Sequence, residues 1–241
     1  MGFGEFAGAL HRPPLNVESS ELLNRSCKRC TRWTLCRTTG SSCLAASWHS
    51  CGDKVMRIYE FEVQEGCEWV APVADTDFEI FRSFDGSAKL AGWQPVQMRL
   101  VREDEHGRPL LPADVPWLGK HAPVLKENAS AALGSLLARD GELLPLACDE
   151  ATLVVFNVTT VLDALDVDRS ALVTFRSTGR IMKVKSHVFR PERLRAVNAF
   201  KVPQLLRGSA FFTDEVVVAV ERAGLRGSRI SLGLGGIAAD A

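Results

Sequence analysis

GELLPLACDEATLVVFNVTTVLDALD, residues Gly141–Asp166, contains two strand patterns that follow each other closely in the chain. The first covers Glu142–Cys148 and the second Thr152–Thr159, with a short polar turn between them. The centre of the second, LVVFNV, is apolar at odd and even positions alike, which is typical of a strand buried on both faces. We therefore expect the second strand at the centre of a sheet.

Upstream of this stretch, residues 126–140 have the pattern of an amphipathic helix. An apolar stripe recurs at helical spacing, at Leu133, Leu136 and Leu137. Asn128 or Ser130 is the predicted N-cap, and Gly141 is the predicted left-handed residue at the end. A second helix is expected from Thr213, as its cap, to Ala223, with Gly224 ending it.

Further strand patterns surround these helices. MRIYEFEV, from Met56, alternates so that Tyr59, Phe61 and Val63 would face the interior. Strands are also predicted at Asp77–Phe84, at Pro95–Val101 and around Ala199–Val202. Leu172–Arg176 and Arg180–Phe189 read as a hairpin, with Met182, Val184 and Val188 on its buried side. Strands before, between and after two helices predict an α+β fold with a mainly antiparallel sheet and packed helices, forming a single domain over residues 56–241.

Residues 1–55 differ in composition from the rest of the chain, since they are rich in Ser, Thr, Arg and Cys. We interpret them as a disordered or non-native upstream segment, because so few aliphatic side chains cannot offset the entropy of ordering. Cys27 and Cys30 form a Cys-x-x-Cys pair, with His49 and Cys51 as further candidate ligands. A zinc site built on them stays an alternative, although the spacing matches no closed four-ligand pattern.

The charges are unevenly distributed along the 241 residues, whose net charge is zero. Residues 56–150 contain seventeen acidic and nine basic residues, whereas residues 151–241 contain eight and thirteen. The acidic part would attract a basic partner. In the hairpin's second strand, Arg180–Phe189, the exposed side carries Lys183, Lys185 and His187 and lacks interleaved aromatic residues, which argues against a nucleic-acid partner. The chain has neither an apolar run long enough for a membrane helix nor a signal-peptide pattern at its start, so we expect a cytoplasmic protein with no membrane partner.

The sequence shows little catalytic chemistry. Its histidines are not in metal-binding spacing, and a Cys148 nucleophile with His187 as base is the only pairing worth considering. Three acidic residues look like a cation cluster but lack the glycine and glutamate of a calcium loop, so we read them as a solvated turn: Asp163, Asp166 and Asp168. Gly233–Gly236 reads as a flexible tail. We predict no cofactor and no enzymatic activity.

Several segments together resemble a family of bacterial immunity proteins of the myxobacterial type, found beside polymorphic and contact-dependent toxins. The resemblance covers residues 56–227 and rests on the order of six segments: WLGKHAPVLKENASAALGSLL (117–137), GELLPL (141–146), FNVTTVLDALD (156–166), HVFRPERL (187–194), FKVP (200–203) and FFTDEVVVAVERAGLRG (211–227). The end of the chain, SRISLGLGGIAADA, departs from the family, which has an aromatic strand there.

The resemblance implies an antidote that binds the toxin domain encoded by an adjacent gene and blocks it. Binding needs only a complementary surface, and aromatic side chains are the usual anchors of such surfaces. The candidate anchors are Trp69, Trp93 and Trp117, and the candidate acidic rim is Glu103, Asp104 and Glu105. The alternatives are a small cytoplasmic enzyme of unknown reaction and a zinc or nucleic-acid binder that uses the cysteine-rich segment.

Overall fold

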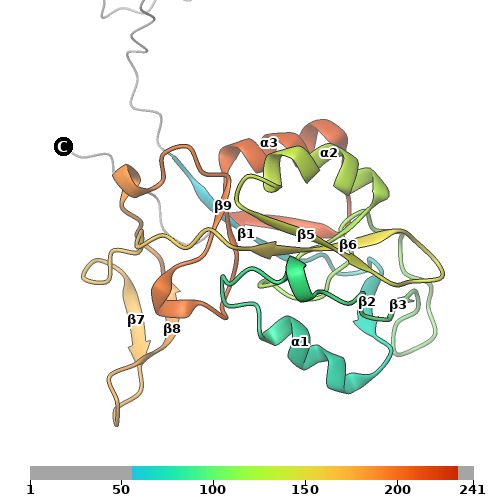
Figure 1. Ribbon diagram of the computed structural model, residues 1–241, viewed down its shortest axis with the longest axis horizontal. Helices are drawn as coiled ribbons and strands as arrows, with labels where there is room; N and C mark the ends of the chain where they lie inside the picture. The colour runs from blue at the N-terminus through green and yellow to red at the C-terminus, as the bar shows by residue number, and fades with distance from the viewer. Residues whose placement is uncertain (1–55, 233–241) are drawn as a thin grey trace, which may run out of the picture. The chain divides into compact units, whose positions relative to one another are not determined.

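The computed structural model describes residues 56–232, and the cysteine-rich segment and the glycine-rich tail lie outside this range (Figure 1). The helices are α1 (Phe78–Arg82), α2 (Glu127–Leu137) and α3 (Asp214–Ala223). The strands are β1 (Ile58–Val63), β2 (Trp69–Pro72), β3 (Met98–Val101), β4 (Val124–Lys126), β5 (Gly141–Leu146), β6 (Leu153–Val158), β7 (Ala171–Thr174), β8 (Ile181–Ser186), β9 (Ala199–Phe200), β10 (Phe211–Thr213) and β11 (Ser228–Leu232).

The strands form four sheets, and all of their ladders are antiparallel. The larger sheets have the orders β11-β1-β10-β9 and β4-β6-β5, and the smaller ones pair β2 with β3 and β7 with β8. The expected α+β fold with a mainly antiparallel arrangement is therefore confirmed. Within residues 56–232, no helix combines the length and the apolar character needed to cross a lipid bilayer.

Three apolar clusters lie on the two faces of the larger sheets. In the β4-β6-β5 sheet, Phe156 contributes to a first cluster with α2 and α3, whereas Val155 contributes to a second cluster with α1 and β3. In the other sheet, Phe212 joins the first cluster and Phe211 joins a third. Because side chains alternate along a strand, neighbouring residues supply opposite clusters. The prediction that β6 is central and buried on both faces is thus correct.

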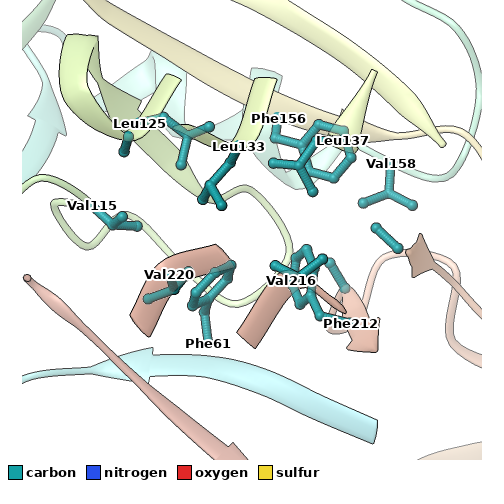
Figure 2. Packing of buried hydrophobic residues seen from close by; sticks show 13 residues of the cluster. Phe61, Val115, Leu125, Leu133, Leu137, Phe156, Val158, Phe212, Val216 and Val220 are labelled. Atoms are coloured by element: carbon teal, nitrogen blue, oxygen red, sulfur yellow. The ribbon is translucent and has the colours of Figure 1, made fainter. Parts of the chain in front are cut away.

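The first cluster packs the helices α2 and α3 against both of the larger sheets. Leu133 and Leu137 of α2 are fully buried there, together with Phe61 of β1 and Val216 of α3. Figure 2 shows these side chains meeting in one continuous core. Each fully buried side chain of this size contributes about 1.5–3 kcal/mol by leaving water.

The two long helices lie where the sequence predicts, but their ends differ in detail. The N-cap residue of α2 is Lys126, so the predicted caps at Asn128 and Ser130 are wrong. Thr213 is the N-cap residue of α3 as predicted, although its side chain makes no cap hydrogen bond. Gly224 ends α3 with φ 62°, as expected.

Gly141 has a different role from the predicted one. It opens β5, and a Cβ placed on it would lie 2.3 Å from the carbonyl oxygen of Asn157 and 2.7 Å from the ring of Phe156. A close approach between two strands therefore requires glycine here, rather than a left-handed helix end.

Residues 77–84 form α1 and its flanking turns rather than the predicted strand. Phe81 and Phe84 are buried three positions apart, while Ile80 is exposed, which fits a helical period. Asp75, Asp77 and Glu79 lie at the start, where acidic side chains favour a helix.

The β1 strand departs from the predicted alternation. Ile58 is fully buried, whereas Val63 is 48% exposed. β1 lies between β10 and β11, so its first half is covered by the first cluster on one face and the third on the other, and its end reaches the surface. β11 completes this sheet without the expected aromatic residues.

Candidate partner-binding surface

Two of the three predicted tryptophan anchors come together at one place. β2 pairs with β3 on one side, and on its other side Trp69 forms a parallel bridge with Trp117. The Val70 amide donates to the Trp117 carbonyl oxygen at 3.0 Å. Trp69 is 39% exposed, and Trp117 is half-buried against the first cluster. We call Trp69 and Trp117 the tryptophan pair.

A hollow of about 540 Å³ lies beside Trp117. The end of β1, the two residues that follow it, the segment after Trp117 and the start of β11 supply its wall. The hollow is lined by Glu62, Val63, Gln64, Glu65, Trp117, Lys120 and Arg229. It therefore combines an apolar wall, made by Val63 and Trp117, with a charged rim. This combination suits a side chain that buries an apolar body and leaves a polar tip at the edge.

The charges on this rim hold one another in place. Lys120 Nζ lies 3.4 Å from Glu60 and 3.2 Å from Glu62, and Arg229 pairs with Glu62 at 2.9 Å. The hydrogen bond from Arg229, with help from Lys120, holds the pKa of Glu62 below its usual value despite partial burial. Burial opposes a charged Lys120, but Glu60 and Glu62 outweigh it and raise the pKa of Lys120. Glu62 and Lys120 thus stabilise each other in their charged forms.

Beneath the tryptophan pair, a buried carboxylate fixes the backbone. Glu68 is 3% exposed, and it accepts hydrogen bonds from the Ala113 amide at 2.8 Å, from Arg102 Nε at 3.3 Å and from Lys126. Burial alone would raise the pKa of Glu68, but the bonds from Lys126 and Ala113 outweigh it and lower that pKa. Glu68 therefore stays ionised. Its hydrogen bonds hold residues 111–117 against β2, and this fixes the backbone that carries the tryptophan pair.

The predicted acidic rim lies on the loop that follows β3, whose Val101 pairs with Trp69. Glu103 and Glu105 are exposed. Asp104 instead stabilises the loop, because it accepts the Arg108 amide at 2.9 Å, the Arg108 Nε at 2.6 Å and the His106 amide at 2.8 Å. These bonds, led by that of the Arg108 amide, lower the pKa of Asp104. Glu103 and Glu105 thus face solvent, where they could meet a partner, with Glu105 lying 3.9 Å from His106 Nε2.

Trp93 has a different environment from the tryptophan pair. Its ring lies 6.0 Å from that of Phe84 and 6.5 Å from that of Phe81, and its Nε1 donates to the Pro145 carbonyl oxygen at 2.7 Å. Its indole is engaged in the second cluster, so we do not include Trp93 in the surface.

The structure does not bring together the side chains of the other candidate sites, namely the Cys148–His187 pair and the acidic cluster. Cys148 packs against the second cluster, whereas the His187 ring stacks on Phe189 at 5.7 Å in the region of the third. Asp163 pairs with Arg190 at 3.5 Å, and Asp166 caps the turn that follows it. Among residues 56–232, no group of three or more His, Cys, Asp or Glu side chains is placed to hold a metal ion. The candidate zinc ligands and the glycine-rich tail lie outside the described residues.

Sequence reasoning identified the two tryptophans but missed the hollow. The strand pattern places Val63 in the interior. No local pattern indicates that Lys120 and Arg229 meet Glu62, because both lie far from it in the chain. The alternation of Glu60 and Glu62 on β1 was the one available sign of a charged edge. No protein-family model matches this chain, and a comparison with curated proteins found no match.

Proposed function

We propose that this protein is a cytoplasmic immunity protein that binds a cognate bacterial toxin domain and neutralises it. The observation that carries the proposal is the tryptophan pair beside the charged hollow. The order of segments that resembles immunity proteins supports the same function. In this reading the protein protects the producing cell and its siblings by covering a surface of the toxin.

The tryptophan pair has the properties of an interface hot spot. Trp69 offers a half-exposed indole on a backbone already fixed by Glu68 and by β3, so little backbone order has to be gained on binding. Stable protein complexes bury about 1,600 Å² in total, and a few central aromatic residues supply most of the affinity. The hollow beside Trp117 would receive a side chain of the toxin.

The surrounding charge favours a basic toxin. Glu103 and Glu105 are exposed near the end of β3, and Glu65 lies on the rim of the hollow. Acidic groups at the edge of an interface accelerate the encounter with a basic partner and make it depend on salt. A nuclease domain is a toxin of this charge class.

The proposal is tested by rescue and by affinity. The full-length chain is co-expressed with the toxin-like polypeptide encoded beside its gene, and growth of a sensitive host is measured. Binding of the two purified proteins is then measured by titration calorimetry. We expect rescue by the wild type and, for Trp69→Ala, an affinity at least about 30-fold weaker, since a hot-spot truncation costs about 2 kcal/mol or more.

Val73→Ala is the matched control. Val73 directly follows β2 and is 61% exposed, so its truncation changes an apolar side chain on the same segment without touching the tryptophan pair. It should bind and rescue like the wild type. If Trp69→Ala and Val73→Ala both retained full affinity, the tryptophan pair would not be the contact, and a wild type that neither bound nor rescued would overturn the proposed function.

A further inference from the structure

The β7–β8 hairpin is a separate structural arm. β7 and β8 pair with each other, and in Figure 1 they extend away from the larger sheets. The Phe175 amide donates to the Arg180 carbonyl oxygen at 2.9 Å, and the Gly179 amide donates to the Phe175 carbonyl oxygen at 2.8 Å. Gly179, with φ 68°, allows this tight tip. At its base, Val184 packs in the third cluster and anchors the arm.

The arm carries a concentrated positive charge. Residues 169–195 contain one acidic residue, Glu192, and eight basic ones: Arg169, Arg176, Arg180, Lys183, Lys185, Arg190, Arg193 and Arg195. All of the basic residues except Arg190 are exposed. In the described part of the chain, the pair between Arg190 and Asp163 is the only salt bridge that any of the eight makes.

This pattern contrasts with the hollow beside Trp117, where Lys120 and Arg229 are both paired with glutamates. Asp163, Asp166 and Asp168 lie at the base of the arm, but no acidic residue lies between Arg169 and Pro191, so the hairpin itself keeps a net positive charge. Such a charge attracts a polyanion.

The tip of the arm also exposes an aromatic ring. Phe175 is 48% exposed and lies between β7 and the turn, next to Arg176. Met182 on β8 is 51% exposed, although the sequence pattern placed it on the buried side. The strand pattern did not predict an aromatic side chain among the exposed cations, because Phe175 falls at an apolar position of the predicted strand. The structure brings it to the surface.

We propose that the β7–β8 hairpin binds double-stranded nucleic acid. A two-stranded antiparallel ribbon fits the major groove of B-form DNA, and its lysines and arginines would contact phosphates on both sides. Phe175 would make an apolar contact with a thymine methyl group in the same groove. This inference is independent of toxin binding and goes beyond the immunity function.

An anionic lipid surface is the competing partner for a basic arm. Arg176 and Arg180 flank Phe175 at the tip, but the cations extend well beyond it, along β8 and on to Arg195. Phe175 and Met182, each about half exposed, offer little further area to bury among acyl chains. The distribution of charge therefore favours a long polyanion.

The test measures binding of the full-length protein to a short fluorescent duplex DNA by anisotropy over a series of salt concentrations. We expect affinity to fall as salt rises. The triple variant Arg180→Gln, Lys183→Gln, Lys185→Gln should lower the slope of log affinity against log salt by about 2.7, since each phosphate contact contributes roughly 0.9. Phe175→Ala should weaken binding about tenfold and leave that slope unchanged, because an apolar contact with a thymine methyl group is not an ionic contact.

The matched control is the triple variant Arg99→Gln, Arg139→Gln, Arg222→Gln, which removes the same charge from exposed positions on β3, after α2 and on α3. It should retain the wild-type slope. Circular dichroism would show that all variants fold. If both triple variants lowered the salt slope and the affinity equally, the binding would come from the general charge of the protein, and the proposal would be overturned. Absence of DNA binding would also overturn it, as would tighter binding to phosphatidylserine vesicles than to DNA.

Discussion

Lys201 is a buried cation whose substitution tests the interior of the protein directly. The residue has no exposed surface, and its Nζ donates to the carbonyl oxygens of Phe84 at 2.7 Å and Leu206 at 3.0 Å. Both acceptors are neutral carbonyl groups. Burial therefore lowers the pKa of Lys201 to about 8, and the charge of Asp85 opposes this shift only in part.

The lowered pKa predicts how stability depends on pH. In the unfolded chain the pKa of Lys201 returns to its usual 10.5. Between the two pKa values the unfolded state holds a proton that the folded state has released, so the free energy of unfolding rises with pH. From about pH 7.5 to pH 10 the contribution of Lys201 amounts to about 2 kcal/mol, at roughly 1.4 kcal/mol per pKa unit.

The assay is urea unfolding of the wild type and of Lys201→Met at several pH values in this window. Other groups titrate here too, but they cancel in the difference between the two proteins. We expect the wild type to gain about 2 kcal/mol relative to the variant as pH rises. Lys201→Arg is a second comparison, because a guanidinium stays charged and should also lack the gain. If the difference between wild type and both variants did not change with pH, Lys201 would not be buried as the structure shows.

Two further predictions concern other positions in the interior of the protein. Burial, with a contribution from Lys201, lowers the pKa of His121 to about 4. The free energy of unfolding should therefore fall as pH drops from 6.5 toward 4. The variant His121→Gln should reduce that fall when unfolding is measured in acid. Gly141→Ala should cost about 1–3 kcal/mol in urea unfolding because its Cβ would overlap Asn157. Gly92→Ala, with open space around it, is its control; equal stability of the two variants would show that β5 and β6 are not in close contact at Gly141.

Local patterns were sufficient for the elements that bury a full apolar face. LVVFNV predicted a central strand because only a strand covered on both sides is apolar at every position, and β6 is such a strand. The leucines of α2 and the glycine after α3 predicted both long helices for similar reasons. These signals lie within a few residues of one another, so no knowledge of distant partners was needed.

Patterns failed where distant segments decide what is buried. Residues 77–84 alternate like a strand, but α1 forms because Phe81 and Phe84 both pack against the second cluster. Val63 alternates like a core residue, yet β1 ends at the surface there. A strand pattern records which residues are apolar, and it does not record how far the covering elements extend.

The amino-acid sequence by itself determined the fold class, the central strand, the two long helices and the presence of three tryptophans and an acidic loop. Tertiary structure alone decided that the backbones of Trp69 and Trp117 pair with each other while the Trp93 ring packs beside Phe84. It also decided that Glu62 meets Lys120 and Arg229, and that Phe175 lies exposed at the tip of a cationic arm. Secondary structure follows from periodicity over a few neighbouring residues, whereas a binding surface depends on contacts between residues far apart in the chain, and these exist only after the sheets have paired.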